Sequence, residues 1–287
     1  MRFGMCGCFL PADMAEMTPE ICRRVRELGF SGIFTRFARN DPHTTPAHQA
    51  HRLRDVMAGE GVKLYQVTGY WQNLVNTDEG QRREAVQTLQ AALVLAGHMG
   101  ARGIDTGPGS MSPDGPWFPH PENWTAACRR QLVKSLKECA VAAEDAGVYV
   151  SLEGHQLVTL ESAQITCEIL DEVGSTWIRS DYDSANWITR ETVYDTTAAL
   201  NRDFDTLGRH IVSCHAKDIR IENRLCLHLQ DGCPGTGNMD FKTLFRRMEA
   251  LSPEYPVISE GNGTDELPAV SALFHNTARE LGIQVLD

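Results

Sequence analysis

Residues 18–37, TPEICRRVRELGFSGIFTRF, contain one complete unit of a helix followed by a strand. The Thr-Pro pair is typical of a helix start, apolar residues then recur every three or four positions, and Gly29 is typical of a helix end. The next segment, Phe30–Phe37, is rich in aromatic and β-branched residues, as expected of a buried strand. Strands that alternate with helices in this way predict a parallel sheet.

The same unit recurs along the whole chain at intervals of roughly 30 to 45 residues, about the length of one βα unit. The segments with strand character are Arg2–Phe9, Phe30–Phe37, Val62–Tyr70, Gly103–Gly107, Val148–Gly154, Trp177–Asp183, Ile211–Asp218 and Tyr255–Gly261. No glycine-rich phosphate-binding sequence follows the first of them. We therefore predict an α/β protein with a single (β/α)8 TIM barrel over residues 1–287, and not a doubly wound sheet.

The composition indicates which kinds of binding partner and which cellular compartment to expect. The 287 residues include 27 Lys and Arg against 38 Asp and Glu, which gives a formal net charge of −11. This acidic balance argues against nucleic acids and anionic membranes, because both are polyanions. No apolar run reaches transmembrane length, and the start has no basic leader followed by an apolar stretch. Together with nine cysteines that follow no repeating frame, this predicts a cytoplasmic protein with reduced thiols.

Ionisable side chains stand at the ends of the last four predicted strands. They are Glu153, Asp183, His215 and Glu260, and each is separated from the next by one βα unit. In a barrel, strand ends converge on one face, where three unpaired carboxylates would repel one another. A divalent cation removes this conflict, and oxygen-rich ligands with one imidazole suit Mn²⁺, Mg²⁺ or Co²⁺. We predict a metal site at these four residues, with Mn²⁺ as the expected ion.

Four short strings carry a family resemblance: LEGH at 152–155, DYDSAN at 181–186, CHAKD at 214–218 and ISEG at 258–261. Together they resemble the xylose-isomerase-like TIM-barrel superfamily of sugar and sugar-phosphate isomerases and epimerases. The resemblance implies that Glu153, Asp183, His215 and Glu260 hold the metal, and that the two glutamates act as acid and base. Many members carry a histidine at the position of Asn186.

The reaction that we expect is isomerisation or epimerisation of a keto-sugar or related polyol. One carboxylate removes the proton beside a carbonyl and the other returns it, and the metal polarises the carbonyl. His155 stands two residues after Glu153 and so shares its face of the strand. If His155 is a base, the same site supports β-elimination by a lyase or dehydratase on a keto-sugar, inosose or keto-glycoside. The sequence leaves both reactions open.

Four further residues are expected to contact the carbohydrate: Asn186, Lys217, Trp117 and Trp71. Indole rings commonly pack against sugar faces, but they are also ordinary core residues. Lys217 has a second interpretation as the partner that orients His215 or forms a buried ion pair. Two long segments, 106–123 and 219–238, are expected to be loops on the same face of the barrel.

Two other functional classes of barrel protein are less consistent with this sequence. An apurinic-site endonuclease would share the barrel, but its metal cluster needs more histidines, and the negative charge disfavours DNA. A non-catalytic barrel with a structural metal has no use for two extra proton-transfer glutamates. We therefore expect a small-molecule carbohydrate as substrate and a homo-oligomer, a dimer or tetramer, as the assembly.

Overall fold

The computed structural model describes residues 1–68 and 71–287 and contains a closed barrel of parallel strands. Its strands are β1 (Arg2–Cys6), β2 (Gly32–Arg36), β3 (Lys63–Thr68), β4 (Gly103–Thr106), β5 (Tyr149–Glu153), β6 (Ile178–Asp183), β7 (Ile211–Ala216) and β10 (Pro256–Ser259). Each lies within a segment predicted to be a strand, so the (β/α)8 fold is confirmed. The expected end of the third strand, at residues 69–70, lies outside the described residues.

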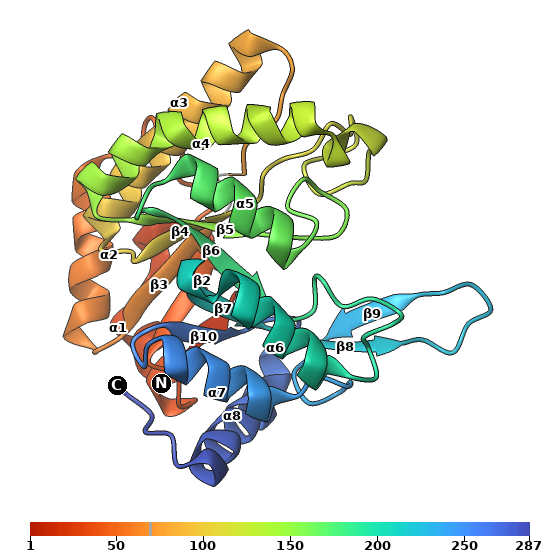
Figure 1. Ribbon diagram of the computed structural model, residues 1–287. Coiled ribbons are helices and arrows are strands. Elements are labelled where there is room, and N and C mark those ends of the chain that lie inside the picture. Colours follow the sequence, from red (N-terminus) through yellow and green to blue (C-terminus); the bar gives the residue numbers. More distant parts are fainter. Residues whose placement is uncertain (69–70) are drawn as a thin grey trace.

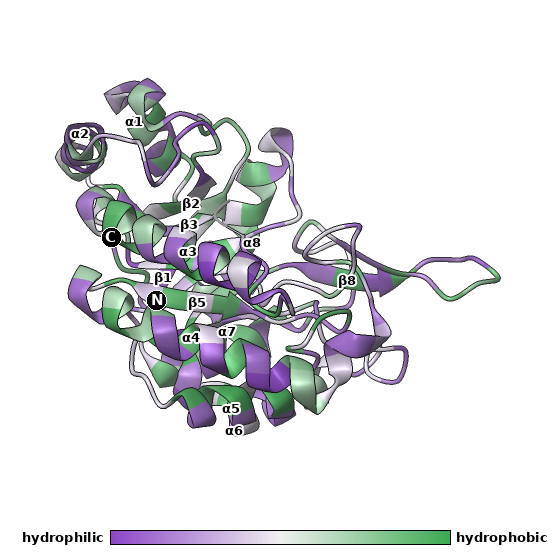
Figure 2. Ribbon diagram, turned by 90° about the horizontal axis from the view of Figure 1, so that it is seen from above, coloured by the Kyte–Doolittle hydropathy of each residue, from purple (hydrophilic) through white to green (hydrophobic). Residues whose placement is uncertain are grey.

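Eight α-helices among the described residues surround the barrel (Figure 1). They are α1 (Pro19–Glu27), α2 (Ala47–Gly59), α3 (Glu79–Met99), α4 (Ala126–Ala146), α5 (Ala163–Val173), α6 (Thr196–Leu207), α7 (Phe241–Leu251) and α8 (Leu267–Leu281). Short 3-10 helices occur at Met14–Glu16, Pro121–Trp124, Gly208–His210 and Thr264–Glu266. The outer helices alternate hydrophilic and hydrophobic segments (Figure 2), as expected when one side packs on the barrel.

Local sequence explains where these helices begin and end. The Thr18 side chain accepts a hydrogen bond from the Ile21 amide and caps α1, as the Thr-Pro pair predicted. Gly147 ends α4 with a φ of 65°, a left-handed conformation that glycine adopts without steric cost. None of the described helices combines the length and the apolar character that crossing a bilayer requires.

One prediction about the long segments is wrong. We expected a strand to Asp218 and a loop over 219–238, but β7 ends at Ala216 and an antiparallel hairpin follows, β8 (Asp218–Ile221) with β9 (Leu229–Gly232). This hairpin lies outside the barrel and projects from it in both views (Figures 1 and 2). Asp218 starts it because its buried carboxylate accepts hydrogen bonds from the amides of Ile219, Gly235 and Met239.

Strand register carries polar side chains to one end of the barrel. Glu153 is level with Asp181 across β5 and β6, and Asp183 is level with His215 across β6 and β7. Glu260 follows the last residue of β10, the neighbour of β7. All of these positions lie at the carboxyl ends of their strands, the end where TIM barrels place their active sites.

Candidate active site

Four of the predicted site residues meet in space. Glu153, Asp183, His215 and Glu260 each offer one ligand atom, and these atoms all lie within 4.8 Å of one another. The first three are buried, whereas the Glu260 side chain is 26% exposed. The cluster is therefore enclosed by the barrel on one side and open toward the strand ends on the other.

His215 is held in one orientation by residues from distant strands. Its Nε2 lies 2.8 Å from Asp181 Oδ2 and 2.9 Å from Gln66 Oε1. The ring stacks on Phe34, with 4.6 Å between the ring centroids. The hydrogen bond of Nε2 goes to the Gln66 side-chain oxygen, and Asp181 Oδ2 is a close charged neighbour. A histidine that donates through one nitrogen presents the lone pair of the other, the usual arrangement of a metal-binding imidazole.

The other nitrogen of His215 faces Glu260. Nδ1 lies 2.9 Å from Glu260 Oε2, yet the geometry is not that of a hydrogen bond. Burial disfavours a charged imidazole, but the carboxylates of Asp181 and Glu260 outweigh it and raise the pKa of His215 well above its ordinary value. These two carboxylates thus favour a positive charge at Nδ1. Either a proton or a metal ion can supply that charge.

The ligand atoms themselves fit a divalent cation. Within the described residues, Asp183 Oδ2, His215 Nδ1 and Glu260 Oε2 are buried without a hydrogen-bond partner. Buried polar atoms are nearly always hydrogen-bonded, so three such atoms directed at one centre need an explanation. Carboxylate oxygens with one imidazole nitrogen are a suitable donor set for Mn²⁺ or Mg²⁺.

Lys217 also reaches this cluster. Its Nζ lies 2.8 Å from Asp183 Oδ2, 3.4 Å from Glu260 Oε2 and 3.6 Å from Glu153 Oε1. Burial opposes its charge, but these carboxylates raise the pKa of Lys217 well above its ordinary value. Lys217 thus lies in a buried ion-pair network, and its contact with a carbohydrate stays a prediction.

The two glutamates differ in their surroundings. Burial raises the pKa of Glu153 well above its ordinary value. Partial burial acts on Glu260 in the same direction, but the charges of His215 and Lys217 overcome it and lower the pKa of Glu260 to about 2. Two carboxyl groups whose pKa values are driven apart are typical of a proton-transfer pair.

Asn186 and His155 lie beside Glu153. Asn186 Nδ2 donates to Glu153 Oε1 at 2.7 Å and to the Gly154 carbonyl at 3.1 Å, so the amide orients the glutamate. His155 Nδ1 accepts from the Leu157 amide, and burial lowers the pKa of His155. His155 and Asn186 line a cavity of about 320 Å³ together with Asp231 of β9.

The predicted aromatic residues form a pair near the ends of β3 and β4. The rings of Trp71 and Trp117 are perpendicular, with centroids 6.5 Å apart. The Arg36 guanidinium lies 5.1 Å from the Trp71 ring centroid. Trp117 packs so closely on Gly107 that a Cβ there would lie 2.5 Å from the indole. The structure thus brings both indoles together near the ends of β3 and β4, and their contact with a carbohydrate stays a prediction.

Sequence reasoning did not identify the residues that support His215. Phe34, Gln66, Asp105 and Asp181 are all buried around it. Burial raises the pKa of Asp105 to about 7, and Thr68 donates to its Oδ2 at 3.0 Å. The sequence signal that could have identified two of them is a polar residue within an otherwise apolar strand, as Gln66 in LYQVT (64–68) and Asp105 in GIDT (103–106).

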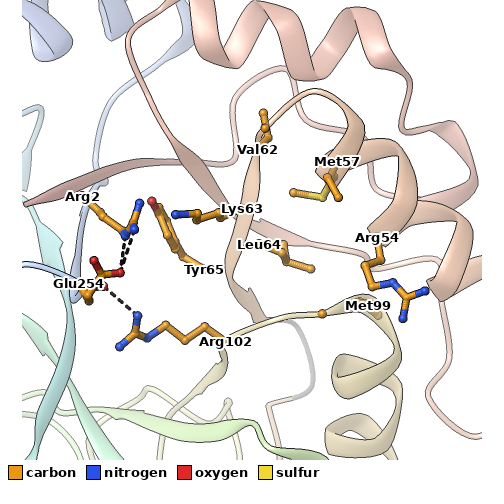
Figure 3. A pocket seen from close by; sticks show the side chains of 13 residues that line it. Arg2, Arg54, Met57, Val62, Lys63, Leu64, Tyr65, Met99, Arg102 and Glu254 are labelled. Atoms are coloured by element: carbon orange, nitrogen blue, oxygen red, sulfur yellow. Dashed lines mark hydrogen bonds and ion pairs between the residues drawn. The ribbon is translucent and has the colours of Figure 1, made fainter. Parts of the chain in front are cut away.

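A second cavity, of about 530 Å³, opens at the opposite end of the barrel, where the strands begin (Figure 3). Arg2, Lys63 and Arg102 lie there at or next to strand starts, and Arg2 pairs with Glu254 at 2.8 Å. The carboxyl ends of α2 and α3 adjoin the same cavity. Cations beside helix carboxyl ends complement the helix dipoles, so this charge pattern stabilises the barrel end.

Comparison with known proteins agrees with this architecture. A family model described as xylose isomerase-like TIM barrel matches residues 22–276. No curated protein sequence matches the chain.

Solved structures with the same fold are similar over nearly their whole length. D-psicose 3-epimerase with D-tagatose, from Clostridium cellulolyticum H10, is 16% identical with a TM-score of 0.73, covering 99% of this chain and 100% of that one. A probable 3-DHS dehydratase from Bacillus anthracis is 15% identical with a TM-score of 0.70, covering 96% and 99%. A xylose isomerase-like protein from Mycobacterium smegmatis in complex with magnesium is 15% identical with a TM-score of 0.66, covering 93% and 90%. At these identities the likeness shows the fold alone. Because the family model spans most of the sequence, the chain belongs to the xylose isomerase-like TIM barrel family.

Proposed function

We propose that this protein is a divalent-metal-dependent isomerase or epimerase of a keto-sugar or related polyol. The observation that carries the proposal is the convergence of Glu153, Asp183, His215 and Glu260 at the carboxyl end of the barrel. The psicose epimerase named above has the same fold, which supports this class of substrate.

The four converging residues would hold the metal, and Mn²⁺ is the expected ion, with Mg²⁺ or Co²⁺ as alternatives. When bound, such an ion polarises a substrate carbonyl and thereby acidifies the neighbouring C–H bond. The magnesium complex of the Mycobacterium smegmatis protein supports a divalent cation in this fold.

Glu153 and Glu260 are the proposed acid and base. In the barrel, β6 and β7 separate β5 from β10, so the two carboxylates approach the centre from different directions. One removes the proton beside the carbonyl, and the other returns a proton to the opposite face of the same carbon. Asn186 orients Glu153 for this transfer through its 2.7 Å hydrogen bond.

A lyase or dehydratase reaction is the second candidate, and the position of His155 favours it. This imidazole lines the cavity beside Asn186, and burial lowers the pKa of His155. To act as the base, His155 would exchange the hydrogen bond from the Leu157 amide for the substrate proton. In a β-elimination the base takes the proton beside the carbonyl, and the C–H electron pair forms the new double bond. The leaving group then departs from the next carbon with the C–O electron pair and takes up the proton that the base removed, so that it leaves as water or an alcohol. The dehydratase with the same fold supports this alternative.

One experiment tests both reactions. Protein stripped with EDTA and reloaded with Mn²⁺ is incubated in deuterated water with a panel of keto-hexoses and keto-glycosides. Deuterium beside the carbonyl without loss of a leaving group supports the isomerase, whereas an unsaturated product supports the lyase. Metal-loaded protein that produces neither change across the panel would contradict the proposed function.

Two substitutions test the roles of the glutamates. Glu153→Gln and Glu260→Gln preserve size but cannot transfer a proton, so each is expected to abolish turnover while the circular dichroism spectrum stays unchanged. Exposed Glu280→Gln, which alters a surface ion pair with Lys242, is the control and should retain activity. Near-normal turnover in either site variant would remove that residue from the proton-transfer pair.

A further inference from the structure

The side chain of Lys217 lies against the same oxygens that the proposed metal requires. We propose that Lys217 is a tethered counter-cation that competes with the divalent ion for the carboxylate cluster and so sets the affinity of the site. This inference rests on the proposed function, because it concerns the metal of that same site. Lys217 is then a positioning residue for the metal.

The backbone fixes Lys217 at this position. Its amide donates to Ser184 Oγ at 3.2 Å, and the same hydroxyl donates back to the Lys217 carbonyl at 2.9 Å. The side chain is only 11% exposed, and its ammonium contacts carboxylates from three different strand ends. Its proximity to the cluster is thus built into the junction between β7 and the hairpin.

Two of the oxygens that face Lys217 belong to the proposed ligand set. Asp183 Oδ2 and Glu260 Oε2 lie 2.8 and 3.4 Å from Nζ, and both lack a directed hydrogen bond within the described part of the chain. An ion bound to these oxygens would lie only a few Å from a positive charge, where repulsion is strong in a buried site. The ammonium must either withdraw or weaken the binding, and in both cases it lowers the affinity.

Removing this charge is expected to have two opposite effects. Without the ammonium, three buried carboxylates repel one another, which destabilises the protein when metal is withheld. The same three carboxylates then attract a divalent cation more strongly. A residue that merely packs in the core would change stability without tightening metal binding.

The test uses Lys217→Met, which keeps the length of the side chain but not its charge. Mn²⁺ affinity is measured by isothermal titration calorimetry on EDTA-treated protein, and the melting temperature is measured in EDTA and in Mn²⁺. We expect binding about tenfold tighter or more, a lower melting temperature in EDTA, and a larger rise on adding Mn²⁺. Lys217→Arg, which retains the charge, should stay near wild type, as should the surface control Lys242→Met.

Unchanged or weaker Mn²⁺ binding by Lys217→Met would overturn this inference. If that variant does not fold without metal, Lys217→Gln, which retains a polar group, replaces it with the same expected tightening. Wild-type protein that binds no Mn²⁺ would instead contradict the proposed metal-dependent function, so the two failures are distinguishable.

Discussion

At the scale of single residues, the environment of His215 explains how this site is organised. Its Nε2 is directed at Asp181, its ring is covered by Phe34, and only Nδ1 faces the other converging residues. A partner behind a metal ligand fixes the ring and makes the free nitrogen more basic. We therefore expect the charge of Asp181 to act on the proposed metal site through His215.

Asp181→Asn keeps the shape of this residue and removes its charge. We expect Mn²⁺ binding to weaken about 10- to 100-fold, because the imidazole loses the carboxylate that increases its basicity. Calorimetric titration of metal-free protein measures this. Asp203→Asn is the matched control, since Asp203 is a buried carboxylate of α6 that accepts a hydrogen bond from the Tyr182 hydroxyl. Equal affinities in the two variants would show that Asp181 has no specific role toward His215.

At the scale of elements, strand ends determine both the site and its surroundings. Lys217 separates β7 from the hairpin, so the chain leaves the barrel directly beside the carboxylate cluster. Asp218 makes this change of direction possible by accepting three backbone hydrogen bonds. The hairpin tip carries Leu225 in full contact with solvent.

Asp218→Ala is expected to loosen the hairpin and the segment before α7. Three backbone amides lose their acceptor, those of the buried Ile219 and Met239 and that of the exposed Gly235, which destabilises the protein by about 2–5 kcal/mol. Hydrogen exchange should then accelerate over residues 218–239 more than in the barrel strands, and urea denaturation should report the loss of stability. Glu222→Ala removes a partly buried hairpin carboxylate that pairs with the exposed Arg224 and accepts from none of these three amides, so it should change neither measurement. If hydrogen exchange in Asp218→Ala accelerated no more over residues 218–239 than in the barrel strands, the anchoring role of Asp218 would be contradicted.

At the scale of the whole molecule, the contacts between neighbouring βα units govern stability. His210 connects two of them, because its Nε2 lies 2.9 Å from Asp171 of α5 and its Nδ1 accepts from Arg179 of β6 at 3.0 Å. This pattern is that of a neutral imidazole, since Arg179 can only donate. Protonation of His210 would break the contact with Arg179.

The pH dependence of stability follows from this contact. Burial lowers the pKa of His210, although Asp171 opposes the change, so the folded protein binds this proton more weakly than the unfolded chain. The free energy of unfolding should therefore fall as the pH decreases below about 6.5, the ordinary pKa of histidine. Urea denaturation between about pH 5 and 7.5 measures the slope, which should be shallower in His210→Gln than in wild type. Replacing the exposed His228 instead should preserve the wild-type slope, and an unchanged slope in His210→Gln would contradict the assignment.

The fold and the main elements of the site were predictable from local patterns. Each barrel strand lies within its predicted segment. The reason is that buried side chains in strands and helices are apolar, so the spacing of apolar residues along the sequence predicts both kinds of element. The hairpin was missed because it lies outside the barrel and most of its residues after Ile219 are at least partly exposed, so its strands lack the apolar pattern of a barrel strand. Asp218, which anchors it, was interpreted from the sequence as the end of the preceding strand.

The sequence by itself determined the barrel and the strand ends that carry Glu153, Asp183, His215 and Glu260, because one βα unit separates each from the next. Only the tertiary structure decided what touches these residues. Gln66 reaches His215 across 149 positions of the chain, and Lys217 joins carboxylates from three strands. Such contacts form only when the barrel closes, because closure brings together residues that are distant in the chain. The local spacing of residues in the sequence therefore does not predict them.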